Sequence, residues 1–345
     1  MKNQLAAILI GTVFALLIVE LMLRAFGLVQ LTDEYLPQDN YLKFKLKPGI
    51  DKVLYSADKT PFEMKTNSLG FQDIGFRDEG LDGIPYAVVV GDSFTFGLGV
   101  DANETWVKLL QTKTNHHFTN MGVVSYSTVA EERTLEKYGI KLKPKLVIVG
   151  FAINDYSDSY DFFNNVSVTK NFLDSLREKI AIYKFLWQRL GELKHDTEII
   201  KYKDESLDFI FWPQPAMDDV SSRYEKVNVG EKFAQESFLR IKKLADDNNA
   251  TLIVVLLPAK EQVYWNIVSK LVRNPQDYEF DFPTDSMNKF CTLNKLNCLD
   301  LAPKFREKAK MGGQLFFRID SHYNKLGNEL VANEIYNYLR QIGAI

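Results

Sequence analysis

The residues Tyr86-Ala-Val-Val-Val-Gly-Asp-Ser-Phe-Thr-Phe-Gly-Leu-Gly99 combine an apolar run with a sharp stop at glycine. The run over 86–90 is short and rich in β-branched residues, which is typical of a buried parallel strand. It stops at Gly91-Asp92-Ser93, and a helix can begin near Phe94. The side chains after such a strand lie at the carboxyl edge of the sheet, where open α/β folds hold their sites. We expect Ser93 at that edge with an exposed hydroxyl; the alternative is a loop serine that caps the next turn.

Length and composition are those of a folded protein. The chain has 345 residues, of which 46% are hydrophobic and 25% charged, so it can bury a full core as one large domain or two. The net charge is −3, and Lys and Arg are scattered along the chain. The sequence therefore shows no basic cluster of the kind that binds nucleic acid. The only two cysteines, Cys291 and Cys298, lack the pattern of a zinc site. They fit a disulfide in an oxidising compartment and two reduced core thiols equally well.

The N-terminal segment predicts a membrane anchor over residues 5–27. Leu5–Leu23 is apolar except for Glu20, and about 20 residues of helix cross a bilayer. Glu20 and Arg24 are four residues apart and can pair on one helix face. The alternative is a cleaved signal peptide, but Leu23 stands where a small residue should precede the cut. Basic residues on the two sides are nearly balanced, so charge alone does not set the orientation.

The remaining chain predicts a tether over 28–65 and a globular domain over 66–345. Within the domain, apolar runs alternate with segments of helical spacing. We expect strands at 86–90, 117–121, 146–151, 251–257 and 297–301, and helices at 104–112, 128–138, 237–248 and 328–341. This alternation favours a parallel sheet with right-handed crossovers and helices on both faces.

Residues 156–224 interrupt this alternation. They are rich in aromatic residues interleaved with Lys and Arg, and 171–193 has the apolar stripe of an amphipathic helix. We interpret the segment as a cap inserted over the carboxyl edge of the sheet. Interspersed acidic residues argue against nucleic-acid binding. The alternative is an interface with the membrane or with a partner membrane protein.

A serine nucleophile needs a base within hydrogen-bond reach and an acid that orients the base. The chain has four histidines. His116 and His117 begin the second strand, at the far edge of the sheet, and His195 falls in the predicted cap. His322 lies in a loop before the last helix, with Asp320 two residues before it. Taken alone, this Asp-x-His is also typical of helix capping.

Four short blocks raise a more specific hypothesis. Gly91-Asp-Ser-Phe94, Asn120-x-Gly122, Asn154-Asp155 and Asp320-x-His322 each occur at the end of a predicted strand or in the last loop. In this order they resemble the SGNH hydrolases, the GDSL-type esterases and acyltransferases. The resemblance covers roughly residues 66–155 and 250–342. It implies a three-layer α/β/α sandwich with a parallel sheet of about five strands in flavodoxin-like order.

The resemblance also implies a role for each matching residue. Ser93 matches the nucleophile, His322 the general base and acid, and Asp320 the carboxylate that orients the histidine. The oxyanion donors would be the Ser93 N–H, the Gly122 N–H and the Asn154 amide. No metal or organic cofactor is implied. The commoner last block is Asp-x-x-His, and the shorter spacing here resembles membrane-associated and polysaccharide-modifying branches. If Asp320 only capped its loop, Ser93 and His322 would act as a dyad.

The implied activity is acyl-ester chemistry through a Ser93 acyl-enzyme. Anchored bacterial members that resemble this chain usually face the periplasm or the cell exterior, which implies an acetylated cell-surface glycan or lipid-linked sugar as substrate. Hydrolysis and acyl transfer use the same triad, and the residues do not choose between them. The alternative is a catalytically silent binding or assembly subunit of a membrane complex with the same fold.

Overall fold

The computed structural model describes residues 2–25, 35–72, 86–164, 180–183 and 199–345. The chain divides into two compact units, one of residues 1–37 with 165–196 and one of residues 38–164 with 197–345. The second unit contains every predicted site residue.

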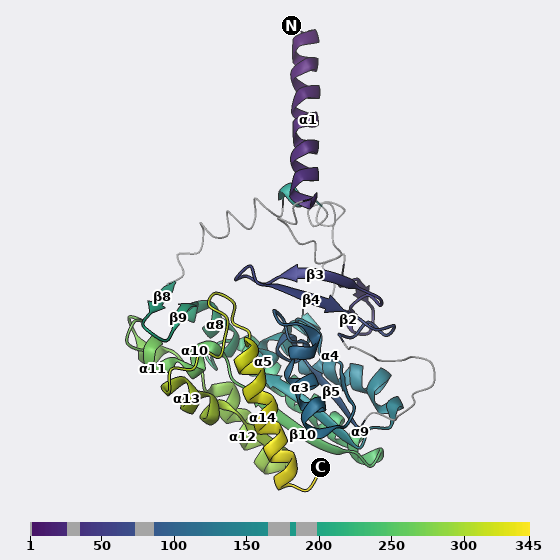
Figure 1. The fold of residues 1–345 in the computed structure, drawn as a ribbon, viewed down its shortest axis with the longest axis vertical. Helices are drawn as coiled ribbons and strands as arrows, with labels where there is room; N and C mark the ends of the chain where they lie inside the picture. The colour runs from purple at the N-terminus through teal and green to yellow at the C-terminus, as the bar shows by residue number, and fades with distance from the viewer. Residues whose placement is uncertain (1, 26–34, 73–85, 165–179, 184–198) are drawn as a thin grey trace. The chain divides into compact units, whose positions relative to one another are not determined.

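The second unit is built on a five-stranded sheet in the order β11-β10-β7-β5-β6, and all four pairings are parallel. Its strands are β5 (Ala87–Gly91), β6 (Phe118–Asn120), β7 (Leu146–Ala152), β10 (Thr251–Leu257) and β11 (Asn297–Asp300). β5 and β7 are buried along their whole length because helices cover both faces of the sheet (Figure 1). The predicted α/β sandwich is confirmed, and each predicted strand lies within two residues of its observed bounds.

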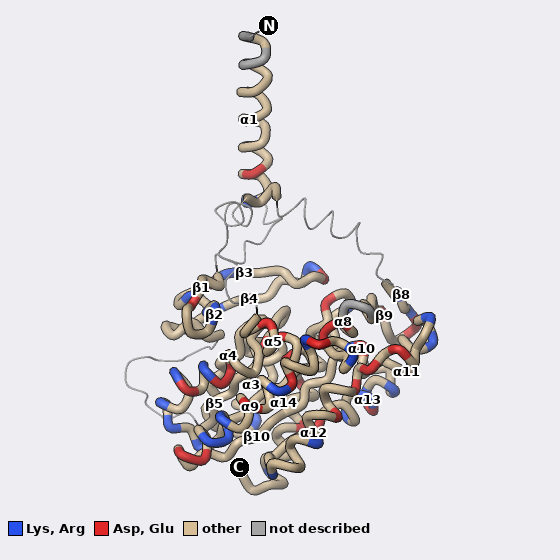
Figure 2. Tube along the Cα trace, turned by 180° about the vertical axis from the view of Figure 1, so that it is seen from behind, with Lys and Arg blue, Asp and Glu red and all other residues tan. Residues whose placement is uncertain are grey.

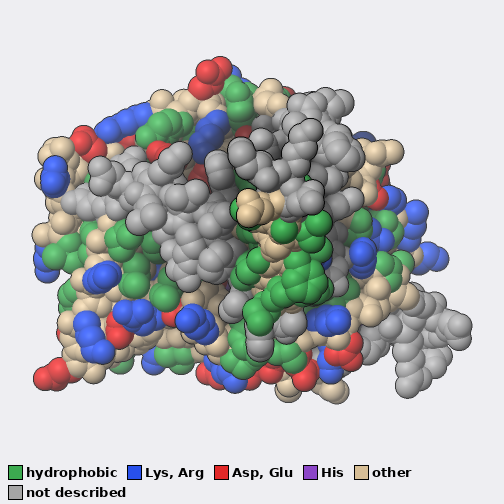
Figure 3. Space-filling model, turned by 90° about the horizontal axis from the view of Figure 1, so that it is seen from above, with side chains coloured by type: hydrophobic (Ala, Val, Ile, Leu, Met, Phe, Trp, Pro, Cys, Tyr) green, Lys and Arg blue, Asp and Glu red, His purple; other side chains and the backbone are tan. Residues whose placement is uncertain are grey.

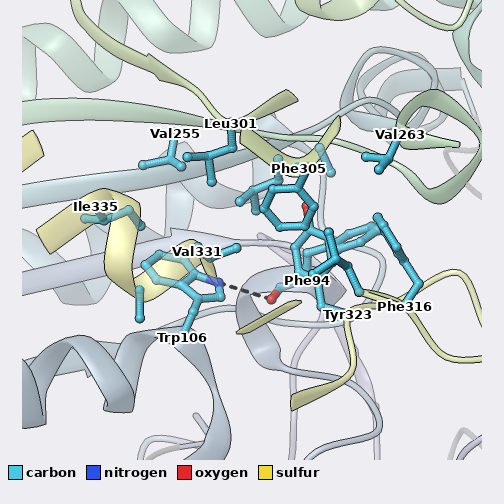
Figure 4. Close-up of a cluster of buried hydrophobic side chains, with 14 of the residues drawn as sticks. Phe94, Trp106, Val255, Val263, Leu301, Phe305, Phe316, Tyr323, Val331 and Ile335 are labelled. Carbon is cyan, nitrogen blue, oxygen red and sulfur yellow. Dashed lines mark hydrogen bonds between the residues drawn. The ribbon is translucent and has the colours of Figure 1, made fainter. Parts of the chain in front are cut away.

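One face of the sheet packs on α3 (Trp106–Thr114), α13 (Ala302–Lys310) and α14 (Lys325–Gln341). Figure 4 shows buried side chains of these helices, among them Trp106, Phe305 and Val331, in one cluster with Val255 of the sheet. The indole Nε1 of Trp106 donates to the backbone oxygen of Phe94 over 3.2 Å. This bond ties α3 to the residue that follows Ser93. Truncating such a buried Trp to Ala typically costs about 3–5 kcal/mol.

The opposite face carries α4 (Thr128–Thr134) and α9 (Glu225–Asp247), where Phe238 of α9 packs on Phe151 of β7. α9 begins twelve residues before the predicted start at 237, and the predicted helix over 128–138 divides into α4 and a π-helical turn over Leu135–Gly139. Shorter helices complete the unit: α2 (Ser93–Phe96), α5 (Asp155–Asn164), α8 (Pro213–Val220), α10 (Lys260–Val263), α11 (Trp265–Val268) and α12 (Phe282–Asn294). Cys291 of α12 and Cys298 of β11 form a disulfide.

The predicted tether, 28–65, is shorter in the structure, because the second compact unit begins at residue 38. Two antiparallel hairpins fill the segment: β1 (Gln38–Asp39) with β2 (Lys43–Phe44), and β3 (Asp51–Tyr55) with β4 (Pro61–Lys65). In β4, Phe62 and Met64 are buried and their neighbours are not, which is the alternation of a half-buried strand. The polar residues around this short strand obscure its alternation in the sequence.

The predicted cap, 156–224, is described only in part. Its described portion holds most of α5, the hairpin of β8 (Ile200–Lys203) with β9 (Asp208–Phe211), and α8. Phe209 and Phe211 are buried, and the Ile210 N–H donates to the backbone oxygen of Arg318 over 2.8 Å. Most of the predicted amphipathic helix over 171–193 lies outside the described residues. The cap as a whole stays a prediction.

The first unit contains α1 (Lys2–Ala25). It is the only helix in the described part of the chain that is long and apolar enough to cross a membrane, over Ala7–Arg24. Figure 2 shows acidic and basic residues close together near the C-terminal end of α1, where Glu20 and Arg24 lie. These two side chains form the predicted pair, and Glu20 also accepts hydrogen bonds from the Ala181 and Ile182 N–H groups, both at 2.9 Å. Length and composition fit a membrane anchor and a signal peptide alike.

Charges on the surface are mixed. On the face seen in Figure 3, Lys and Arg side chains lie among acidic and apolar ones. This arrangement agrees with the net charge of −3.

Candidate active site

Ser93 lies at the carboxyl end of β5, as predicted, and begins the short helix α2. Asp92 caps this helix, since its Oδ1 accepts a hydrogen bond from the Phe94 N–H over 2.9 Å. Gly97 has a φ of +85°, which favours glycine, and it ends the helix after one turn. Ser93 is only 8% exposed, so the expectation of an exposed hydroxyl is wrong. Neighbouring side chains cover it.

The loop after β6 packs tightly against α2. A Cβ at Gly122 would lie 2.5 Å from the Phe96 nitrogen, so no larger residue fits without moving the helix. Asn120 connects the two segments: its Nδ2 donates to the Thr95 oxygen over 2.8 Å, and its Oδ1 accepts the Gly122 N–H over 2.9 Å. The Gly122 N–H, predicted as an oxyanion donor, therefore already has a partner in Asn120.

Asp320, His322 and Ser93 form one continuous chain of hydrogen bonds. The Nε2 atom of His322 lies 2.7 Å from Ser93 Oγ, and the Nδ1 atom is hydrogen-bonded to Asp320 Oδ1. Asp320 Oδ1 also accepts the His322 backbone N–H over 3.0 Å. The structure thus brings together three residues from the two ends of the domain in the arrangement of nucleophile, base and orienting acid. Asp320 contacts the imidazole itself and does more than cap the loop.

The imidazole is held by packing as well as by hydrogen bonds. The ring of Phe94 lies 4.9 Å from the His322 ring and 4.8 Å from the Tyr323 ring, measured between centroids. The Tyr323 hydroxyl donates to the Pro258 oxygen at the end of β10 over 2.8 Å. Burial alone would raise the pKa of Asp320, but the hydrogen bond and charge of His322 outweigh it, so the pKa lies below its ordinary value. Asp320 is therefore a carboxylate at neutral pH.

Asn154 follows β7 at the same edge of the sheet and directly precedes α5. Its Nδ2 donates to Asp158 Oδ2 over 2.7 Å. Burial raises the pKa of Asp158 to about 7; the Asn154 hydrogen bond opposes this effect, and the charge of Asp92 adds to it. Asp158 was not among the predicted site residues. Its spacing from Asn154, one helical turn, is the signal that could have found it.

Three more carboxyl groups are fully buried beside Asn154 and Ser93. They belong to Asp92, Glu131 and Asp155. Burial raises the pKa of each, and their mutual repulsion raises the values of Glu131 and Asp155 further. The two carboxyl oxygens of Glu131 have no hydrogen-bond partner among the described residues. A carboxyl group in such surroundings favours its neutral, protonated form.

The other predicted candidates lie elsewhere. His116 stacks on Tyr86 with ring centroids 4.3 Å apart, and with His117 it precedes β6, at the amino edge of the sheet. His195 lies outside the described residues. In the described part of the chain, no group of three or more His, Cys, Asp or Glu side chains is placed to hold a metal ion. A cavity of about 590 Å³ between α9 and α12, lined in part by Trp265, Tyr278 and Arg306, contains none of the predicted site residues.

Comparison with known families agrees with this geometry. The profile of the GDSL-like Lipase/Acylhydrolase family matches residues 89–274, which include Ser93, Gly122 and Asn154. A second profile, described as the SGNH hydrolase-like domain of the acetyltransferase AlgX, matches residues 221–344, which include Asp320 and His322. A search of curated proteins returned no match.

Solved structures with a similar fold share little sequence with this chain. The acetyl xylan esterase AlAXEase is 15% identical with a TM-score of 0.41, over 73% of this chain and 99% of that one. A GDSL-like lipase from Bacteroides thetaiotaomicron VPI-5482 is 10% identical with a TM-score of 0.41, over 77% and 93%. The psychrotrophic esterase EstA from Pseudoalteromonas sp. is 12% identical with a TM-score of 0.40, over 75% and 100%.

Proposed function

The chain belongs to the GDSL-like lipase/acylhydrolase family, and on this premise we propose that it cleaves or transfers an acyl ester through an acyl-enzyme on Ser93. The observation that carries the proposal is the hydrogen-bond chain from Asp320 through His322 to Ser93 Oγ. A serine hydroxyl is a weak nucleophile by itself, and a neutral imidazole within hydrogen-bond reach supplies the base that it needs.

The reaction follows from the positions of these atoms. Ser93 Oγ attacks the ester carbonyl carbon while His322 Nε2 takes the hydroxyl proton, and Asp320 stabilises the resulting imidazolium. The bond between the carbonyl carbon and the leaving oxygen then breaks, and His322 returns the proton to the leaving alcohol. An acyl-enzyme remains on Ser93. Water or a sugar hydroxyl then attacks it by the same steps, which releases an acid or a new ester.

The negative charge on the carbonyl oxygen needs donors near Ser93. We assign this role to the Ser93 N–H, the Gly122 N–H and the Asn154 amide. The Ser93 N–H belongs to the first turn of α2, where N–H groups have no acceptor within the helix. The Gly122 N–H has a partner in Asn120 and must be shared with the oxyanion as it forms, whereas the Asn154 amide carries two N–H groups and donates one of them to Asp158 Oδ2. Each such donor typically stabilises the transition state by about 2.7–4 kcal/mol.

The proposed acyl group is acetyl, because the profile that covers Asp320 and His322 is that of an acetyltransferase domain. The proposed substrate is an acetylated cell-surface glycan or a lipid-linked sugar, in keeping with the Asp-x-His spacing and with α1 as a membrane anchor. The catalytic domain would then face the periplasm or the cell exterior. Hydrolase and transferase differ only in the acceptor that reaches the acyl-enzyme.

A catalytically silent binding subunit is the second candidate. The observation that favours it is the low exposure of Ser93, 8%, together with the partners that the Gly122 and Asn154 donors already have. A silent site would keep these hydrogen bonds permanently, whereas an active one must open them to substrate.

Covalent labelling separates the two candidates. The full chain, purified in detergent, is treated with a fluorophosphonate probe beside the Ser93→Ala and His322→Ala variants. Labelling of the wild type that is lost in both variants supports the enzyme, and release of acetate with or without an added oligosaccharide acceptor then separates transfer from hydrolysis. A folded wild type that takes up no probe contradicts the enzyme and favours the silent subunit.

A further inference from the structure

The backbone that carries Asp320 lies between an anionic and a cationic side chain. Asp58, in the turn between β3 and β4, accepts the Ile319 N–H at 2.9 Å and the Asp320 N–H at 3.0 Å. Lys260, the first residue of α10, donates from Nζ to the backbone oxygens of Ile319 at 3.1 Å and Asp320 at 3.0 Å. In Figure 1 the loop before α14 rises toward the β3–β4 hairpin. The backbone at Ile319 and Asp320 is therefore held at its N–H groups by the Asp58 carboxylate and at its carbonyl oxygens by the Lys260 ammonium group.

Lys260 occupies an unusual position for a charged side chain. It is fully buried, and in the described part of the chain it forms no salt bridge with a carboxylate, so its ammonium group is satisfied by backbone oxygens. Burial lowers the pKa of Lys260, and the negative charges of Glu261, Asp320 and Asp58 oppose this effect. The rings of Phe209 and Phe211 lie 5.7 and 5.9 Å from Nζ. Burying a charge is costly, which favours a specific task for this lysine over simple packing.

The Asp58 side chain is not needed to form its own turn. The Ser56 N–H donates to the Thr60 oxygen at 3.0 Å, and the Lys59 N–H donates to the Ser56 oxygen at 2.9 Å. Ser56 Oγ additionally accepts the Thr60 N–H at 3.2 Å. The turn is therefore closed by Ser56, Lys59 and Thr60. Asp58 instead makes a contact that spans 262 residues of sequence.

We propose that Asp58 and Lys260 are positioning residues that align the Asp320 carboxylate with His322. This inference rests on the proposed function. Asp320 Oδ1 must meet both the His322 N–H and the imidazole Nδ1, and it can do so only if the peptide before it keeps one orientation. Asp58 fixes the N–H side of that peptide and Lys260 the oxygen side. A displacement of about 1 Å in a catalytic group can lower a rate by roughly 100-fold.

The hairpin offers a matched pair of variants. Asp58→Asn removes one negative charge and leaves only one acceptor oxygen for two N–H groups. Glu63→Gln removes the same charge from β4 of the same hairpin, where the carboxylate is 56% exposed and, among the described residues, forms a salt bridge only with Lys65. Lys260→Gln tests the opposite side of the loop. Thermal melting of each full-length variant establishes that it is folded.

Three measurements test the proposal. For acetyl-ester hydrolysis we expect Asp58→Asn to lower kcat by about 10-fold or more with KM nearly unchanged, and the rate of fluorophosphonate labelling to fall in parallel. The pH–rate profile should differ from the profiles of the wild type and of Glu63→Gln, because a displaced Asp320 no longer makes the same contact with the imidazole. The low-field proton NMR signal of His322 Nδ1–H should be present in the wild type and in Glu63→Gln and weakened or lost in Asp58→Asn and Lys260→Gln.

The outcomes separate this inference from the proposed function. If the wild type is active and Asp58→Asn matches Glu63→Gln in kcat, pH profile and NMR signal, the positioning role is wrong and the enzyme stands. If the folded wild type neither turns over nor labels, the proposed function is wrong, and the NMR signal still decides whether Asp58 aligns the pair. Should Asp58→Asn fail to fold, Lys260→Gln and Asp58→Glu provide the same comparison.

Discussion

The side-chain amide of Asn154 donates to the carboxylate of Asp158 over 2.7 Å, one helical turn further along the chain. One of these residues is a proposed oxyanion donor, and burial raises the pKa of the other to about 7. The orientation of the amide is therefore coupled to a group that changes charge near neutral pH. An ionised Asp158 accepts from Nδ2, whereas a protonated Asp158 can donate to Oδ1 and turn the amide around.

Asp158→Asn should make the enzyme less sensitive to acid. The substituted amide still offers an oxygen to Asn154 Nδ2, but it does not titrate. We expect kcat at about pH 8 to stay within a few-fold of wild type, and the acid limb of kcat to move to lower pH, because the group at position 158 no longer takes up a proton near pH 7. The check is kcat against pH for both proteins. An acid limb at the same pH in both would show that Asp158 does not govern Asn154.

Glu131→Gln should stabilise the protein increasingly as pH rises. The pKa of Glu131 is raised in the folded state, so the folded protein holds a proton that the unfolded chain releases near its ordinary pKa of about 4.3. The stability associated with that proton is fully present below this pKa and is lost as pH rises above it. Glutamine does not titrate and escapes this loss. Melting temperatures at about pH 5 and about pH 8 measure the difference, with exposed Glu205→Gln as the control. A constant offset across pH would contradict the prediction.

Ser93→Ala should abolish turnover at a small cost in stability. The substitution removes the nucleophile and one hydrogen bond to His322, and a typical hydrogen bond contributes about 1 kcal/mol. Ser93 has little side-chain volume to lose, so no large cavity forms. Turnover and thermal melting are measured on the same preparation. A large fall in melting temperature would assign Ser93 a structural role instead.

Asn154→Ala should lower kcat by roughly 100-fold or more with little change in KM, because the amide acts on the oxyanion and not on the bound ester. The substitution also leaves Asp158 without its donor and should raise the pKa of that carboxyl further. Steady-state kinetics on an acetyl ester provide the measurement. A normal kcat would remove Asn154 from the site.

Much of the site was predictable because it follows from local pattern. Ser93, Asn120 and Asn154 lie at or just after the ends of apolar runs, and parallel strands bring the residues at their carboxyl ends to one edge of a sheet. Asp320 and His322 come shortly before an amphipathic helix, and this position predicts that they lie in a loop. The sheet, its flanking helices and the candidate nucleophile, base and acid could thus be inferred from periodicity, glycine stops and the resemblance that the four blocks carry.

Local sequence patterns do not predict contacts between elements that are far apart in the chain. Asp58 meets the Asp320 loop, and Lys260 meets it from the other side, without any signal in the residues around them. The partners of the Gly122 N–H and of Asn154, the burial of Ser93 and the Cys291–Cys298 disulfide likewise depend on how separate elements pack.

The sequence by itself determined the architecture and pointed to the candidate site residues, because strand and helix periodicity and the glycine stops act over a few neighbouring residues. Only the tertiary structure decided which side chains hold the site in alignment. Hydrogen bonds and burial join residues up to 262 positions apart, and no local pattern encodes such distances.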